Sequence, residues 1–189
     1  MWRLVYGLAI AMSVDVTAAA GDKGPLTGKV VQALENVVTS AEPEWRLERS
    51  TNYGYHLIQL WERRPKEGET AASAVAGKPK GVQIQVFDLA TPEAAAIKLR
   101  ETLASSSISH TGALDGVGDE AYIWANYNKR GGTTIRVRSG RVMIWISGPS
   151  IETAKKFTSH MLQGVGKYLA DTKGATGGDR PGEWPPSGD

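Results

Sequence analysis

The segment at residues 133–147, TTIRVRSGRVMIWIS, constrains the fold of this chain more than any other part of its sequence. Apolar residues alternate with polar or aromatic ones on both sides of Ser139-Gly140, a dipeptide typical of a two-residue hairpin turn. This alternation predicts two antiparallel strands with one apolar face, on which Ile135 pairs with Ile144. Because an apolar sheet face must be covered, the sequence also predicts helices packed against the sheet.

Patterns of the same kind predict the remaining elements. Strands are expected at residues 45–49, 55–63, 81–89, 121–127, 133–138 and 141–147, and helices at residues 26–38, 92–104 and 151–169. Thr91-Pro92-Glu93 marks the clearest helix start, because threonine caps helices and proline is favoured at their first position. The order α-βββ-α-βββ-α predicts an α+β fold, an antiparallel sheet of about six strands flanked by helices.

The first twenty residues have the pattern of a signal peptide. A basic start at Arg3 precedes a mostly apolar run at residues 4–14, and small alanines end at Ala20. We expect cleavage after Ala20 and an exported product, periplasmic or extracellular, with no membrane span after cleavage. Two alternatives stay open: an N-terminal core helix, and an uncleaved anchor, although Asp15 interrupts the apolar run.

The composition is that of an ordinary globular domain, with 41% hydrophobic and 22% charged residues. We expect a single domain at residues 21–172. Residues 173–189 are rich in glycine and proline and are expected to be disordered, because they carry too little apolar surface to form a core.

Several classes of chemistry lack the residues that they need. The chain has no cysteine, which excludes thiol catalysis, disulfides and a lipoprotein anchor. A net charge of +2 together with export argues against a nucleic-acid partner. Neither a phosphate-binding loop nor a serine-hydrolase elbow is present, since Gly28-Lys29 is followed by Val30 and no G-x-S-x-G occurs. We therefore expect no cofactor, and the three histidines lack the spacing of metal ligands.

An enzyme of unrecognised type, such as a small hydrolase, remains the alternative reading. It would require His110 to meet Asp119 or Glu120 in a cleft. The stretch GVGDE at residues 116–120 is more simply a glycine turn, and adjacent residues on an extended chain point to opposite faces. Of the other histidines, His56 is expected in the core and His160 on the surface.

A basic aromatic face of the sheet is the strongest candidate binding surface. The predicted register places Arg138 opposite Arg141, a repulsive pair that needs compensation. Three alternatives stay open: the arginines extend into water, they stack on Trp124 and Trp145, with helices covering the aromatic side chains, or they bind an anionic or aromatic ligand or an acidic partner. The candidate residues are Tyr122, Trp124, Arg136, Arg138, Arg141 and Trp145.

The stretch GVGDEAY, followed by a strand, a glycine turn, RVRSGRVMIWISG and a closing helix, resembles exported bacterial proteins of the PsbP-like α/β sandwich type. The resemblance covers residues 112–169, and the first half only by element order. It implies an antiparallel sheet with flanking helices and a binding or assembly role, with no catalytic residue to carry over. Many such proteins are lipoproteins, whereas this chain lacks the anchoring cysteine. The leading hypothesis is therefore an exported, non-enzymatic binding or assembly module of the bacterial envelope.

Overall fold

The computed structural model describes residues 25–64, 81–105, 112–124 and 132–173. The predictions for the signal peptide, for residues 125–131 and for the tail from residue 174 lie outside the described residues. In chain order the elements are α1 (Gly28–Ala41), β1 (Trp45–Asn52), β2 (His56–Arg63), β3 (Gly81–Asp88), α2 (Pro92–Ser105), β4 (Gly112–Ala113), β5 (Glu120–Trp124), β6 (Thr133–Ser139), β7 (Val142–Gly148) and α3 (Ile151–Lys173).

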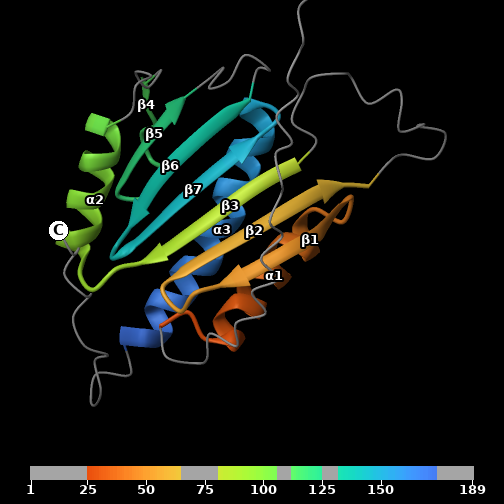
Figure 1. Ribbon diagram of the computed structural model, residues 1–189, viewed down its shortest axis with the longest axis horizontal. Coiled ribbons are helices and arrows are strands. Elements are labelled where there is room, and N and C mark those ends of the chain that lie inside the picture. The colour runs from red at the N-terminus through yellow and green to blue at the C-terminus, as the bar shows by residue number, and fades with distance from the viewer. Residues whose placement is uncertain (1–24, 65–80, 106–111, 125–131, 174–189) are drawn as a thin grey trace, which may run out of the picture.

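The strands form one antiparallel sheet of seven strands in the order β1-β2-β3-β7-β6-β5-β4 (Figure 1). Two meanders, β1–β3 and β4–β7, meet where β3 pairs with β7. The predicted α+β class and helix order are confirmed. The additional strand, β4, has two residues that pair with β5, too few to leave an alternating pattern in the sequence.

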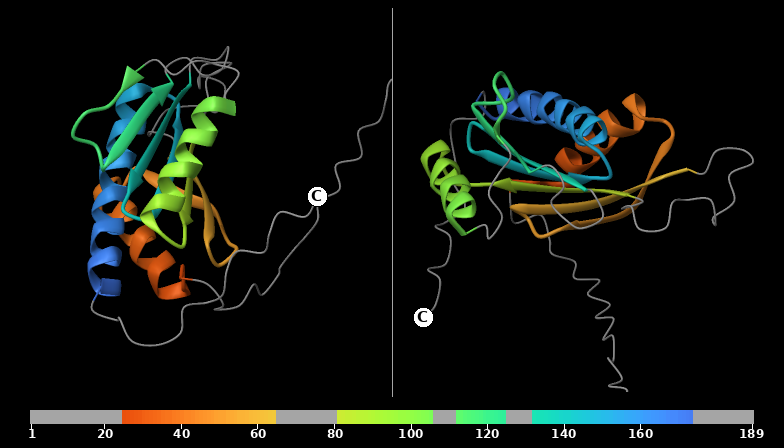
Figure 2. Two further views of the ribbon diagram at one scale, coloured as in Figure 1. Left: turned by 90° about the vertical axis from the view of Figure 1, so that its left-hand side faces the viewer. Right: turned by 90° about the horizontal axis from the view of Figure 1, so that it is seen from above.

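The helices cover the two faces of the sheet unequally (Figure 2). α1 and α3 lie side by side on one face, and α2 lies on the other face against β6 and β7. The main core lies between the sheet and the α1–α3 layer. Its largest fully buried side chains include Leu34, Leu57, Trp61, Ile84, Ile135, Ile144, Ile146 and Phe157.

Local side chains explain where two of the helices begin. The Ala94 backbone N–H donates to Thr91 Oγ1 over 3.1 Å, which confirms the predicted cap of α2. The Thr153 N–H donates to Ser150 Oγ over 3.2 Å at the start of α3. α3 continues to Lys173, beyond the predicted end at residue 169.

The register of the β6–β7 hairpin differs from the prediction by two residues. Ile135 pairs with Ile146 and Arg136 pairs with Trp145, and the turn consists of Gly140 and Arg141. Gly140 has a φ of +57°, which glycine adopts readily in a tight hairpin turn. Because a shift of two residues keeps each side chain on its face, the predicted core face is correct although its partners are not.

The first strand is longer than predicted and contains a β-bulge. The pairing shifts between Leu47, which lies opposite Trp61, and Arg49, which lies opposite Leu60. The bulge therefore interrupts the alternation of side chains between Leu47 and Arg49, which a regular strand would place on the same face.

Candidate functional site

Arg136 of β6 occupies the buried centre of the predicted basic aromatic face. Its guanidinium carbon lies 4.5 Å from the ring centroid of Trp124 and 4.5 Å from that of Trp145. Arg136 Nη1 also donates to the Thr102 carbonyl of α2 over 3.2 Å, and the side chain is 8% exposed. Arg136 therefore stacks on tryptophans, which is one of the predicted alternatives, and α2 lies over it. The charge interacts with two ring faces inside the protein.

Arg138 lies near the end of β6 and binds two carboxylates. Its Nη1 is 2.9 Å from Asp119 Oδ2, and its Nε is 3.7 Å from Glu120 Oε2. The expectation that Asp119 and Glu120 point apart is wrong, because Asp119 belongs to the turn before β5 and does not follow strand alternation. Asp119 Oδ2 also accepts a hydrogen bond from the Gly140 N–H over 2.7 Å, so it connects the turn before β5 to the β6–β7 turn.

Arg141 lies in the hairpin turn and contacts α3, away from Arg136. The predicted repulsive pair with Arg138 does not form, because Arg138 lies opposite Met143. Arg141 Nε donates to Asp88 Oδ1 over 2.7 Å, and its Nη2 donates to the Tyr168 hydroxyl over 2.9 Å. The hydrogen bond to Asp88 raises the pKa of Arg141.

Tyr168 completes this cluster at the edge of the core. Its hydroxyl donates a short hydrogen bond to Asp88 Oδ2, and the Asp88 side chain is only 1% exposed. Burial and then the bond to Asp88 raise the pKa of Tyr168 well above its usual value. The Asp88 carboxylate, the Arg141 guanidinium and the neutral Tyr168 phenol therefore satisfy one another's hydrogen-bonding groups. Such an arrangement stabilises the fold.

The remaining candidate residues are also engaged within the protein. The Tyr122 hydroxyl donates to Glu120 Oε1 over 3.0 Å, and the Trp124 side chain is 1% exposed. The indole Nε1 of Trp145 is buried and has no hydrogen-bond partner among the described residues. Because all three candidate arginines have partners within the chain, this face offers no free guanidinium among the described residues to an anion.

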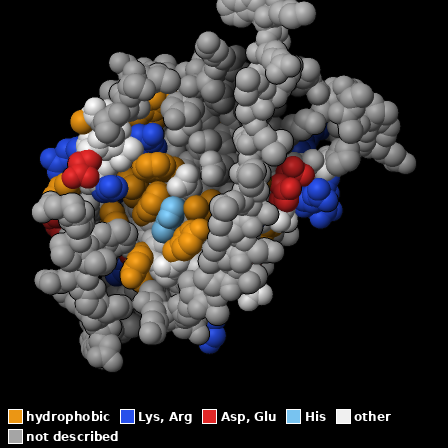
Figure 3. Space-filling view, viewed as in Figure 1, with side chains coloured by type: hydrophobic (Ala, Val, Ile, Leu, Met, Phe, Trp, Pro, Cys, Tyr) orange, Lys and Arg blue, Asp and Glu red, His pale blue; other side chains and the backbone are white. Residues whose placement is uncertain are grey.

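Aromatic rings extend the stack of Arg136 and Trp145 across the same sheet face. The Phe87 ring centroid lies 5.1 Å from that of Trp145 and 4.1 Å from that of His56. The expectation of a core position for His56 is wrong, since it is partly exposed on the face opposite the main core, with Nε2 3.1 Å from Gln85 Oε1. Burial lowers the pKa of His56. Figure 3 views this face and shows hydrophobic side chains gathered over it.

The third helix places His160 beside a buried carboxylate. His160 Nε2 is 3.0 Å from Oε1 of Glu42, the residue that follows α1. The prediction of a plain surface histidine is therefore incomplete, because its side chain is 22% exposed and joins two helices. His110 lies outside the described residues. Within the described ranges, no group of three or more His, Asp or Glu side chains could hold a metal ion.

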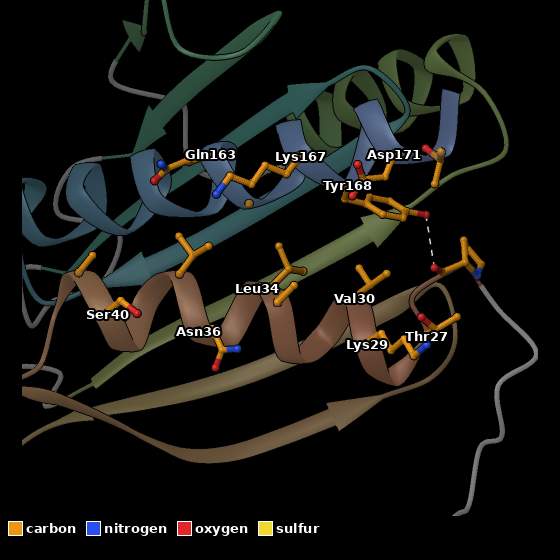
Figure 4. Close-up of a pocket in the computed structure, with 16 residues that line it drawn as sticks. Thr27, Lys29, Val30, Leu34, Asn36, Ser40, Gln163, Lys167, Tyr168 and Asp171 are labelled. Carbon is orange, nitrogen blue, oxygen red and sulfur yellow. Dashed lines mark hydrogen bonds between the residues drawn. The ribbon is translucent and has the colours of Figure 1, made fainter. Parts of the chain in front are cut away.

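An open groove of about 900 Å³ runs between α1 and α3 on the outside of the helical layer (Figure 4). The two helices lie close together at Gly164, where a Cβ atom would lie 2.8 Å from Leu34 Cδ2. Glycine costs helix stability, and here it allows a close approach that a side chain would obstruct. The groove extends along α1 from Thr27 to Ala41, which corresponds to about 20 Å at 1.5 Å per residue.

The groove has an apolar floor and a polar rim. Val30, Leu34 and Val37 line it from α1 at the spacing of one helix face. On the rim, Lys29 and Lys167 form no ion pair with any described residue, in contrast to Arg138 and Arg141. The Tyr168 hydroxyl oxygen lies 3.4 Å from the Pro25 carbonyl oxygen at one end of the groove, as drawn in Figure 4.

The apolar stripe of α1 is divided between the core and the groove. Leu34 and Val38 are buried, whereas Val30 and Val37 are partly exposed toward the groove. The apolar residues of α1 cover a broader face of the helix than contact with the sheet alone requires. This breadth and the glycine in the middle of α3 are the sequence features that indicate a second contact, between α1 and α3.

The chain matches no protein-family model, no curated protein and no solved structure. The resemblance to PsbP-like proteins therefore stays a prediction. Within the described residues, no helix is long and apolar enough to cross a membrane.

Proposed function

We propose that this protein is a non-enzymatic binding module, exported from the cytoplasm, that holds an acidic, partly apolar segment of a partner protein in the groove between α1 and α3. The observation that carries the proposal is a groove with an apolar floor beside lysines that form no ion pair with described residues. The proposal keeps the acidic partner expected from the sequence and moves its binding surface from the sheet to the helices.

The charge distribution favours an acidic partner. The groove is lined by two lysines, Lys29 and Lys167, and by one carboxylate, Asp171. All three side chains belong to exposed residues. Charges at such a rim accelerate association and select against partners of like charge. Arg136, Arg138 and Arg141 are poorer candidates for this role because they already interact with carboxylates or aromatic rings of the same chain.

The shape of the groove favours a helical or extended peptide segment. An amphipathic helix binds by laying its apolar residues, spaced three and four apart, into a hydrophobic groove. A groove of about 20 Å matches a helix of three to four turns. Its volume of about 900 Å³ lies within the range of about 300–1,000 Å³ that is usual for ligand pockets.

Export is supported by the signal-peptide pattern at residues 1–20 and by the absence of cysteine. Mass spectrometry of the secreted product tests it, and a mature chain that begins at Gly21 is the expected result. The hydrolase alternative loses support, because Asp119 and Glu120 both bind Arg138.

The test of the groove uses a synthetic 14-residue amphipathic peptide, with leucines three and four residues apart and glutamates elsewhere, in fluorescence anisotropy titrations. Ala33→Trp fills the groove from an exposed position and should weaken binding at least about tenfold. Gln32→Trp is the matched control, because Gln32 is exposed on α1 and does not line the groove.

A second pair of variants tests the charge. Lys167→Glu reverses a rim lysine and should weaken binding about three- to tenfold at low salt, and less at high salt. Lys155→Glu makes the same change on an exposed residue of α3 outside the groove and should have little effect. Equal affinities for groove variants and controls would show that the peptide does not bind between α1 and α3.

A further inference from the structure

The last turn of α3 lies at one end of the groove. Asp171 and Thr172 line the groove, and α3 ends at Lys173. Figure 4 shows Tyr168 and Asp171 beside Thr27 and Lys29, the first lining residues of α1. The segment at residues 174–189 therefore starts at the mouth of the groove.

The sequence of residues 174–189, GATGGDRPGEWPPSGD, has the chemistry that the groove selects. Trp184 provides one large apolar side chain, of the type that most often anchors an interface. Three carboxylates, on Asp179, Glu183 and Asp189, exceed the single cation of Arg180. The segment is thus acidic and partly apolar, and it complements the rim lysines.

The segment is also long enough to turn back. Glycines at 174, 177 and 178 permit a reversal of the chain directly after α3. From Lys173 to Trp184 an extended chain spans up to about 36 Å, whereas the groove is about 20 Å long. Trp184 can therefore reach the floor at Val30, Ala33 or Val37, even after part of the length forms the turn.

The leader at residues 1–24 also meets the groove, at Pro25. Its charges cancel, however, with Arg3 and Lys23 against Asp15 and Asp22. Cleavage after Ala20 would also remove its apolar part. Charge complementarity with the rim lysines therefore favours the tail over the leader.

We infer that residues 174–189 fold back into the groove between α1 and α3, with Trp184 against its apolar floor, and thereby compete with the partner segment. The inference rests on the proposed function only in that both assign the groove to an acidic, partly apolar segment. An attached segment acts at a high effective concentration, so even weak docking would lower the apparent affinity for a partner.

Disulfide trapping tests the docking in the full chain, because a protein without cysteine allows two introduced thiols to be the only ones. One variant carries Ala33→Cys in the groove and Gly182→Cys near Trp184. The control carries Gln32→Cys and Gly182→Cys, with the same tether and an equally exposed helix position outside the groove. Under oxidised glutathione, we expect the groove pair to close at least about tenfold faster than the control pair. Adding Trp184→Ala to the groove pair should bring its rate down to that of the control.

Equal rates for the two pairs, or a groove rate unaffected by Trp184→Ala, would overturn the inference. In the uncleaved chain, faster closure of Ala33→Cys with Ala18→Cys than with Gly182→Cys would assign the groove to the leader. A disulfide-linked dimer that forms faster at higher protein concentration would assign it to a second copy of the chain, and either outcome overturns docking of the tail.

The acidic peptide separates this inference from the proposed function. If the tail competes, Trp184→Ala in the full chain should bind the peptide several-fold more tightly than the unchanged protein. If the peptide binds in the groove and Trp184→Ala has no effect, docking of the tail is wrong and the proposed function stands. If the tail is trapped in the groove but the peptide does not bind even to Trp184→Ala, the proposed function fails and docking of the tail stands.

Discussion

Arg141 Nε donates a hydrogen bond to Asp88 Oδ1 over 2.7 Å, which joins the β6–β7 turn to the last residue of β3. The Asp88 side chain is 1% exposed, and the Arg141 side chain is 30% exposed. A buried carboxylate is stable in its charged form only with such partners. This pair therefore stabilises the end of the central strands, where the sheet meets α3.

Arg141→Met keeps most of the side-chain volume but removes the cation from beside Asp88. Breaking a buried ion pair typically costs about 3–5 kcal/mol, and we expect about 2–4 kcal/mol here because solvent reaches Arg141. Urea denaturation at neutral pH measures the change. Arg46→Met is the control, because the Arg46–Glu62 pair is exposed on both sides and should contribute less than about 1 kcal/mol. Similar losses for the two variants would contradict a structural role for Asp88 and Arg141.

Tyr168→Phe should change how stability depends on alkaline pH. In the folded state the pKa of Tyr168 is raised from its usual 10.0, chiefly by burial and then by its bond to Asp88. Above pH 10 the unfolded chain releases a proton that the folded chain keeps, so the contribution of this tyrosine to stability falls as pH rises. Urea midpoints at pH 8–11 should decline more steeply for the unchanged protein than for Tyr168→Phe. Parallel declines would show that Tyr168 ionises alike in both states.

The alternation of side chains in the sequence was sufficient to assign the sheet faces. It predicts that Ile135 and Ile144 lie in the core and that Arg136 lies among tryptophans, and the structure has both features. The alternation cannot predict the exact register of the β6–β7 hairpin. A shift of two residues leaves every side chain on its face and changes only the cross-strand partners. The predicted and the observed register differ in whether Ser139 or Gly140 occupies the first position of the turn.

The partners of charged side chains were beyond sequence reasoning. Asp88 and Arg141 are 53 residues apart and come together only because β3 pairs with β7. The groove was hidden for a related reason, since it exists only where α1 and α3 pack. Local patterns report which face of an element is buried, whereas a site between elements depends on how those faces meet.

Arg136→Lys should destabilise the protein although it keeps the charge. The planar guanidinium stacks between Trp124 and Trp145, each ring centroid 4.5 Å from its carbon, and an ammonium lacks this flat shape. We expect a loss of about 1–2 kcal/mol in urea denaturation and a weaker near-ultraviolet circular dichroism signal from the tryptophans. Arg138→Lys is the control, because its carboxylate partners accept an ammonium equally well. The idea is wrong if both lysine variants behave alike.

Gly118→Ala and Gly116→Ala separate backbone strain from steric conflict within one turn. Both glycines have positive φ, +62° at Gly118 and +70° at Gly116. A Cβ atom at Gly116 meets nothing within 4 Å, whereas at Gly118 it would lie 2.4 Å from the Arg138 carbonyl oxygen. Gly116→Ala should therefore cost about 1–2 kcal/mol, the usual penalty for a left-handed residue. Gly118→Ala should cost clearly more in urea denaturation, because the turn must also move away from β6 and weaken the ion pair between Asp119 and Arg138. If the two variants are equally stable, the contact between this turn and β6 contributes nothing to the fold.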